Sequence, residues 1–342
     1  MSYVLDCKAK KTKPLENFQN YALYILLFPQ LIAGPIIRFN EIAAQLINRQ
    51  HQDTIDDKLS GFFRFIIGLA KKVLIADTLG SVADGIFDLA PESLNMATAW
   101  LGIIAYAFQI YFDFSGYSDM AIGIARMMGF RFPENFNFPY ISQSITEFWR
   151  RWHITLGNWM RDYLYIPLGG NRVSTNRMYL NLWIVFLLSG LWHGAAWTFI
   201  IWGAFHGLFL ILDRLFLLKL LKKWGKFPAI LLTYFIVLIG WVFFKANDFS
   251  HALGYIQQLF SFNLGSLIYY TSNKFWFFLV IAFCFSFIGI FPKVEDRVVV
   301  FFDNTTTLWL LNLKVVITLF LGSYCLLEVM ASDFNPFIYF QF

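Results

Sequence analysis

Long apolar stretches restrict the folds open to this chain more than any other feature. Residues 229–244 and 275–291 contain no charged side chain, and residues 315–330 contain one. An α-helix needs roughly 20 apolar residues to cross a bilayer, whereas a transmembrane strand needs about 10. Every backbone polar group in lipid has to be satisfied internally, so stretches of this length indicate helices. We therefore expect an all-α, polytopic integral membrane protein.

The composition supports this interpretation and argues against other classes. Of the 342 residues, 58% are hydrophobic and 14% are charged, whereas soluble proteins carry roughly 25% charged residues. The net charge is +5, but the basic residues cluster between apolar stretches, which indicates membrane topology rather than a nucleic-acid partner. Cys7, Cys284 and Cys325 lie far apart, and no carboxylate or thiolate cluster accompanies them, so neither a disulfide nor a metal site is expected.

Four further stretches are expected in the membrane, at residues 18–37, 96–110, 178–192 and 195–212. Pro29 and Pro35 interrupt the first and favour a broken or re-entrant helix. Between residues 58 and 75, apolar side chains recur at helical spacing among lysines and an arginine, which is typical of a helix at the membrane surface. No repeat or linker divides the chain, so residues 1–342 are interpreted as one membrane domain.

The basic clusters also predict the orientation of the chain. Positive charge is enriched on the cytoplasmic side of membrane proteins. The loop at 246–272 has few cations and is expected outside, whereas the segments expected in the cytoplasm are 8–13, 150–177, 214–226 and 293–297. Counting back from residue 214 places His193 toward the outer half of the bilayer.

His193 is the leading candidate for chemistry, because it lies at the junction of two expected spans. An ionisable group at the centre of a membrane helix costs about 2.5 to 3.5 kcal/mol and is a functional candidate by default. Gly190 and Gly194 allow a helix or a substrate to approach closely. One interpretation is a neutral histidine hydrogen-bonded between helices. The other is a general base, since imidazole has an ordinary pKa of about 6.5 and burial favours its neutral form.

His153 lies in the segment FWRRWHITLGNW (148–159), among tryptophans and arginines. One interpretation is an aromatic belt with cytoplasmic anchors at the membrane interface. The other makes His153 a partner of His193, with nearby guanidinium groups binding the phosphates of an anionic cofactor. The guanidinium candidates are Arg150, Arg151, Arg161 and Arg172.

Other polar residues in apolar surroundings leave alternatives open. The group Asp113, Ser115, Ser118 and Asp119 either lines a polar cavity or caps the end of a helix. His206, between Phe205 and Gly207, is expected to be a packing residue.

Several motifs resemble those of the membrane-bound O-acyltransferase family. They are FSGYSDMAIG (114–123), NFNFPY (135–140), FWRRWH (148–153) and RDYLYIPLGG (161–170). The segments FPQLIAGP (28–35), LWHG (191–194) and FIYFQF (337–342) extend the likeness over essentially the whole chain. The likeness is strongest to the branch that acetylates bacterial polysaccharides.

The resemblance implies a helical bundle with re-entrant and interfacial helices in the bacterial inner membrane. It implies an O-acetyltransferase that takes an acetyl group from cytoplasmic acetyl-coenzyme A, with no other cofactor bound, for an extracytoplasmic polysaccharide such as alginate. The implied partners are the bilayer and an exported SGNH-type acetyltransferase or the polysaccharide itself. His193 matches the characteristic membrane histidine of the family and would act as general base. His153 matches its second active-site position and would donate to the oxyanion or orient the thioester.

One departure from the family pattern and two alternative functions remain. Residues 1–6 resemble a segment that family members carry internally, so the N-terminal helices of the family are expected to be missing here. Asp113, Asp119 and His193 at membrane depth also suit a transporter or channel. The other alternative to an acyltransferase is an inactive scaffold that docks a secreted partner.

Overall fold

The computed structural model describes residues 2–31, 34–303, 307–331 and 337, and these ranges contain helices and no strands. The longer helices are α4 Ile55–Ala70, α5 Asp77–Phe87, α6 Met96–Met127, α9 Thr175–His193, α10 Trp197–Leu212, α12 Lys226–Lys245, α14 Asn273–Phe287 and α16 Leu308–Ala331. The shorter helices are α1 Ser2–Lys8, α2 Phe18–Leu26, α3 Phe39–Ile47, α7 Ile145–Arg151, α8 Ile154–Met160, α11 Leu218–Trp224, α13 Phe249–Leu259 and α15 Val294–Asp303. The all-α prediction is confirmed.

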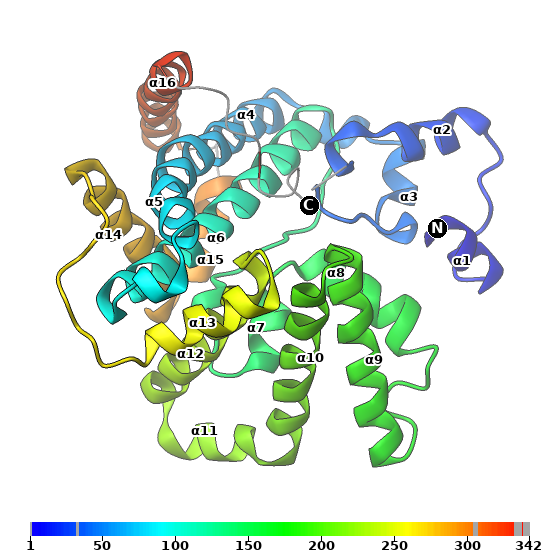
Figure 1. Cartoon of the computed structure of the whole chain (residues 1–342). Helices are drawn as coiled ribbons and strands as arrows, with labels where there is room; N and C mark the ends of the chain where they lie inside the picture. The colour runs from blue at the N-terminus through cyan, green and yellow to red at the C-terminus, as the bar shows by residue number, and fades with distance from the viewer. Residues whose placement is uncertain (1, 32–33, 304–306, 332–336, 338–342) are drawn as a thin grey trace.

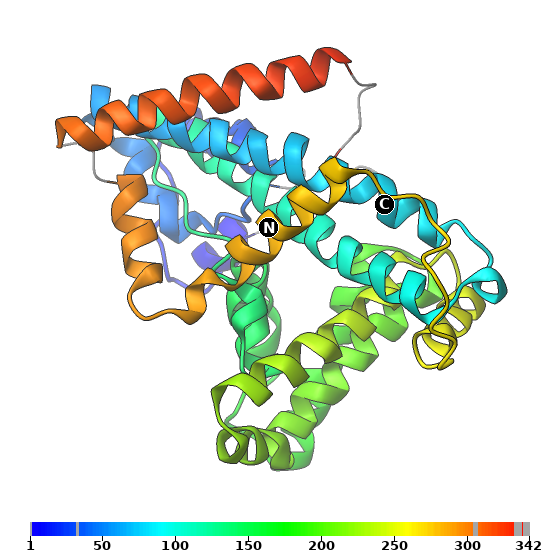
Figure 2. The same cartoon turned by 90° about the vertical axis from the view of Figure 1, so that its left-hand side faces the viewer.

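The helices form three groups around the central helix α6 (Figure 1). Helices α4 and α5 lie along α6, and α16 runs along the outer side of α4 (Figure 2). Helices α9, α10, α11 and α12 form the lower lobe, and α1 to α3 lie to one side (Figure 1). Helix α13 lies within the segment 246–272 and packs on α6 and α12. The site residues come from α6, the α7–α8 segment and the lower lobe.

Helices α4 and α6 pack closely because small residues face each other along the contact. A Cβ atom added to Gly61 would lie 2.6 Å from the carbonyl oxygen of Gly123, and one added to Gly68 would lie 2.5 Å from that of Gly116. Only glycine allows two backbones to approach this closely. The glycine pairs therefore fix the spacing between α4 and α6.

Buried ion pairs cross the same contact. The Asp119 carboxylate contacts the Arg64 guanidinium at 2.8 Å and the Lys71 amine at 2.6 Å. The Lys72 amine lies 2.8 Å from the carboxylate of Asp113 and is buried, as Arg64 is. The helix expected between residues 58 and 75 is present as α4 and the π-helical segment Lys71–Ala76 that follows it. Two of its cations, Arg64 and Lys72, are buried because carboxylates on α6 neutralise them.

The polar residues of α6 are consequently explained by packing. Asp113 and Asp119 lie inside the 32-residue helix, well away from its ends. The helix-cap interpretation is therefore wrong, and both carboxylates are held in ion pairs. Ser118 accepts a hydrogen bond from the side chain of Asn135 at 3.1 Å.

Within the part of the chain that the structure describes, four helical segments are long and apolar enough to cross a membrane. They are Trp197–Trp224, Lys226–Lys245, Asn273–Ile290 and Leu308–Ala331, which coincide with four of the expected spans. The expected spans at 96–110 and 178–192 lie within α6 and α9. The break expected within 18–37 is confirmed, because α2 ends at Leu26 and Pro29 lies in a short 3₁₀ turn.

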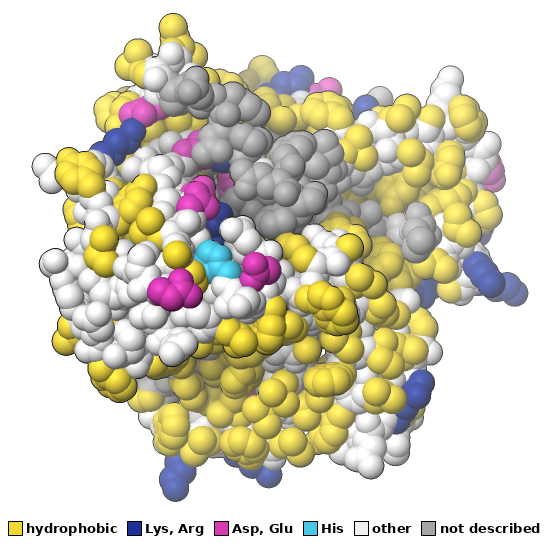
Figure 3. All heavy atoms as spheres, viewed as in Figure 1, with side chains coloured by type: hydrophobic (Ala, Val, Ile, Leu, Met, Phe, Trp, Pro, Cys, Tyr) yellow, Lys and Arg dark blue, Asp and Glu magenta, His cyan; other side chains and the backbone are white. Residues whose placement is uncertain are grey.

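The surface of the lower lobe is mostly apolar (Figure 3). Leu208 on α10, Phe216 beside α11 and Leu231 on α12 are exposed by 45%, 51% and 70%. Basic side chains lie along the lower edge of this face, where Figure 1 places α11. An apolar side wall with a basic rim is the surface expected of a protein embedded in a bilayer.

Candidate active site

His193 is the last residue of α9, at the junction predicted from the sequence. Close packing of α9 on α10 positions it, since a Cβ atom on Gly190 would lie 2.3 Å from the carbonyl oxygen of Phe199. The imidazole ring lies 5.0 Å from the ring of Trp192, 5.1 Å from that of Trp202 and 5.3 Å from that of Phe244. His193 is only partly buried, and these aromatic rings restrict the orientation of its imidazole.

His153 lies between α7 and α8 and is 4% exposed. Its backbone is in the left-handed region, with φ of 44°, which is uncommon for a residue other than glycine and marks a locally constrained site. Its Nδ1 atom lies 3.1 Å from Oδ1 of Asn135, and its ring meets that of Phe114 edge-on at 4.6 Å. The imidazole therefore has a fixed orientation.

The constraint on His153 comes from pairing between two of the sequence motifs. The backbone N–H of Asn137 donates to the carbonyl of Arg151, and that of Ile154 donates to the carbonyl of Asn135, both at 2.9 Å. The motif NFNFPY is thereby held alongside FWRRWH. This pairing presents the side chain of Asn135 to the imidazole of His153.

The structure brings His153 and His193 to opposite ends of one aromatic cluster. The ring of Trp152, next to His153, lies 4.9 Å from that of Trp241, which lies 5.5 Å from that of Phe244. Phe244 in turn contacts His193. Burial lowers the pKa of His153 well below its usual value, and the charge of a protonated His193 lowers it further. His153 is therefore neutral at pH 7.

A comparison with known families identifies the fold to which these motifs belong. The model of the membrane-bound O-acyltransferase family matches residues 5–247, which include both histidines. The chain belongs to the membrane-bound O-acyltransferase family. The resemblance inferred from the motifs is confirmed.

The similarity to individual relatives agrees with this family assignment. The chain is 49% identical to the probable alginate O-acetylase AlgI of Pseudomonas aeruginosa, over 78% of this chain and 51% of the relative. It is 44% identical to the probable alginate O-acetylase AlgI of Pseudomonas putida, over 100% of this chain and 73% of the relative. It is 45% identical to the peptidoglycan O-acetyltransferase of Helicobacter pylori, over 76% of this chain and 50% of the relative. The chain spans about half the length of most of these relatives.

The four arginines proposed to bind a cofactor differ in their surroundings. Arg150 at the end of α7 and Arg172 in the loop before α9 are exposed. Arg151 bonds to the carboxylates of Glu147 and Glu295, each at 2.9 Å. Arg161 contacts Asp162 at 2.7 Å. Arg161 is exposed too, but it contacts a carboxylate, and Arg151 joins α7 to α15. Arg150 and Arg172 are therefore kept as the phosphate-binding candidates.

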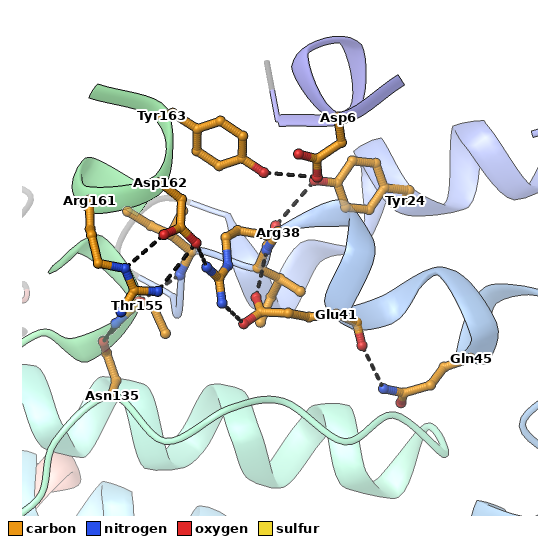
Figure 4. A network of polar contacts seen from close by, with 12 residues as sticks. Asp6, Tyr24, Arg38, Glu41, Gln45, Asn135, Thr155, Arg161, Asp162 and Tyr163 are labelled. Atoms are coloured by element: carbon orange, nitrogen blue, oxygen red, sulfur yellow. Dashed lines mark hydrogen bonds and ion pairs between the residues drawn. The ribbon is translucent and has the colours of Figure 1, made fainter. Parts of the chain in front are cut away.

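A polar network that sequence reasoning missed joins the N-terminal helices to the site (Figure 4). Arg38 forms ion pairs with both Glu41 and Asp162, and the hydroxyl of Tyr163 donates to Asp6 at 2.8 Å. The backbone N–H of Ile36 donates to the hydroxyl of Thr155 at 3.0 Å. The motifs that supply Asn135 and Asp162 were recognised, but nothing in the sequence connects them to residues so distant along the chain.

His206 lies on α10 and is completely buried. Its ring meets those of Trp149, Trp202 and Phe205 at 5.0, 5.2 and 5.5 Å. The prediction that His206 is a packing residue is confirmed.

Proposed function

We propose that this chain forms the catalytic part of a membrane-bound O-acetyltransferase in the bacterial inner membrane. Acetyl-coenzyme A is the cytoplasmic donor, and a hydroxyl group of an extracytoplasmic polysaccharide such as alginate is the acceptor. The observation that carries this proposal is the placement of His193 and His153. Both lie in the matched family region and at the two ends of one chain of contacting aromatic rings.

The proposed reaction needs a proton acceptor and no covalent enzyme intermediate. The acceptor oxygen attacks the carbonyl carbon of the thioester while the imidazole of His193 takes the hydroxyl proton. The carbon–sulfur bond then breaks and the new ester forms. The proton passes from His193 to the sulfur of the departing coenzyme A. General-base assistance of this kind is worth about 10²- to 10⁴-fold in rate.

Arg150 and Arg172 are proposed to bind the phosphates of acetyl-coenzyme A. Guanidinium groups suit phosphate because they form two parallel hydrogen bonds, and these two side chains are exposed within a basic region predicted to be cytoplasmic. A hydrogen bond to a charged group contributes about 1.5 to 3 kcal/mol. Replacing Arg150 or Arg172 with alanine should therefore raise the KM for acetyl-coenzyme A by about 10-fold or more, with little change in kcat.

Lys223→Ala is the control for the arginine variants. Lys223 is an exposed cation of α11, in another cluster that is predicted to be cytoplasmic. Its loss should leave the KM unchanged. Equal KM values for the wild type and both arginine variants would rule out phosphate binding by these two residues.

The acceptor and the partner are proposed from the relatives. Two of the relatives described above carry names for alginate acetylation and one for peptidoglycan acetylation. We propose a polysaccharide hydroxyl as the final acceptor, reached either directly or through an exported SGNH-type acetyltransferase. The transporter alternative is less well supported, because the carboxylates of Asp113 and Asp119 on α6 form ion pairs with Lys72 and Arg64.

Acetyl transfer by the purified chain in lipid nanodiscs tests the proposal. Release of coenzyme A and formation of acetyl esters on the polysaccharide should both fall at least about 100-fold in His193→Ala. His251→Ala is the control, because His251 lies on α13 outside the site. Undiminished transfer by His193→Ala would refute the assignment of the base. Failure of the wild-type chain to bind acetyl-coenzyme A would favour the scaffold alternative.

A further inference from the structure

The amide of Asn135 can take only one orientation. The backbone N–H of Thr155 donates to Oδ1 of Asn135 at 3.2 Å, and a backbone nitrogen cannot accept a hydrogen bond. The atom facing Thr155 is therefore the amide oxygen. On the other side, Nδ2 of Asn135 donates to the hydroxyl of Ser118 at 3.1 Å. Asn135 is 1% exposed, so water does not compete for these bonds.

The hydroxyl of Thr155 supports the same assignment. It accepts the backbone N–H of Ile36 at 3.0 Å and lies 2.9 Å from Oδ1 of Asn135. Its own hydrogen is consequently available to Oδ1 of Asn135. Thr155 thus presents two donors to the amide oxygen.

His153 meets this same oxygen through Nδ1, at 3.1 Å. An amide oxygen can bond only to a nitrogen that carries hydrogen. In a neutral imidazole one nitrogen is protonated and the other has a lone pair. With Nδ1 protonated, the lone pair of His153 is on Nε2.

We propose that Asn135 is a positioning residue that holds His153 in the Nδ1–H tautomer, so that Nε2 accepts a hydrogen bond from a substrate O–H or N–H group. The substrate part of this inference rests on the proposed function. The proposed tautomer excludes one role that the family resemblance implied for His153, which is donation of a hydrogen bond to the oxyanion. A neutral His153 in this tautomer has no hydrogen on Nε2 to donate to an oxyanion, so its remaining role is to orient a substrate group.

Nitrogen NMR of the full chain in lipid bilayers tests the tautomer directly. Histidines labelled with ¹⁵N give distinct signals for protonated and unprotonated ring nitrogens, and His153→Gln identifies the signals of His153. We expect a protonated Nδ1 and an unprotonated Nε2 in the wild type and in Asn135→Asp, which keeps an oxygen acceptor. A protonated Nε2 in the neutral wild-type ring would overturn the inference, whether or not the chain transfers acetyl groups.

Steady-state kinetics distinguish a positioning role of Asn135 from a role in packing alone. Asn135→Leu removes the amide oxygen and should lower kcat/KM about 100-fold or more, as loss of a fixed tautomer does in other histidine-dependent enzymes. Ser118→Ala removes the partner on the opposite side of the same amide and should change kcat/KM less than about 3-fold. Equal losses in both variants would show that Asn135 only packs.

If Asn135→Leu does not fold, the Asn135→Asp variant still decides the question. It should keep the wild-type tautomer and retain more activity than His153→Gln. Activity in Asn135→Asp as low as in His153→Gln, with the tautomer retained, would refute the positioning role.

Discussion

At the scale of single residues, the site consists of two histidines in different environments. His193 is partly exposed at the end of α9, whereas His153 is buried and its orientation is fixed by Asn135. Burial disfavours a charged imidazole, so the environment keeps His153 neutral and able to accept a hydrogen bond. The two environments support the proposal that His193 acts as the base and His153 orients a substrate group.

The pH dependence of activity should report on this environment. The pKa of His153 is lowered mainly by burial, so protonation inactivates it only at a pH below its usual range. Asn135→Asp places a carboxylate beside Nδ1–H, which favours the imidazolium and raises the pKa of His153. The acid limb of the kcat/KM profile should therefore move to higher pH in Asn135→Asp and stay in place in Ser118→Ala. An unchanged acid limb in Asn135→Asp would show that His153 does not titrate in the reaction.

At the scale of elements, glycine contacts between helices position the site. Helix α6 carries Phe114 and Ser118, which contact His153 and Asn135, and glycine pairs set its distance from α4. Close packing of α9 and α10 at Gly190 similarly positions His193. The geometry of the site consequently depends on helix spacing far from either imidazole.

Gly68→Val tests the α4–α6 contact. The new Cβ atom would lie 2.5 Å from the backbone oxygen of Gly116 and 2.7 Å from the backbone nitrogen of Met120, and neither can move without its helix. Overpacking of this kind costs about 1 to 3 kcal/mol. The apparent melting temperature in detergent should therefore fall. Gly322→Ala is the control, because its nearest contact would be an ordinary 3.6 Å from Ile66. Equal melting temperatures for the two variants would contradict the close α4–α6 contact.

At the scale of the whole molecule, the apolar stretches and the family motifs predicted the helical membrane architecture. They also predicted the position of His193 at a helix junction. The ion pairs of Asp113 and Asp119 were not predicted, because the cations that neutralise them, Lys72 and Arg64, are distant in sequence. The contact between Asn135 and His153 was missed for the same reason: it depends on pairing between two loops and on a left-handed backbone at His153. Local patterns identified the elements, whereas contacts between distant segments determine the chemistry of the site.

We propose that the acetyl group crosses the bilayer at His193. Proteoliposomes with the cytoplasmic face of the chain outward test it most directly, with radiolabelled acetyl-coenzyme A outside and the polysaccharide enclosed. Label should accumulate on the enclosed polysaccharide while coenzyme A remains outside, and His193→Ala should abolish this accumulation. Label that reaches the polysaccharide only when donor and acceptor share one compartment would contradict it.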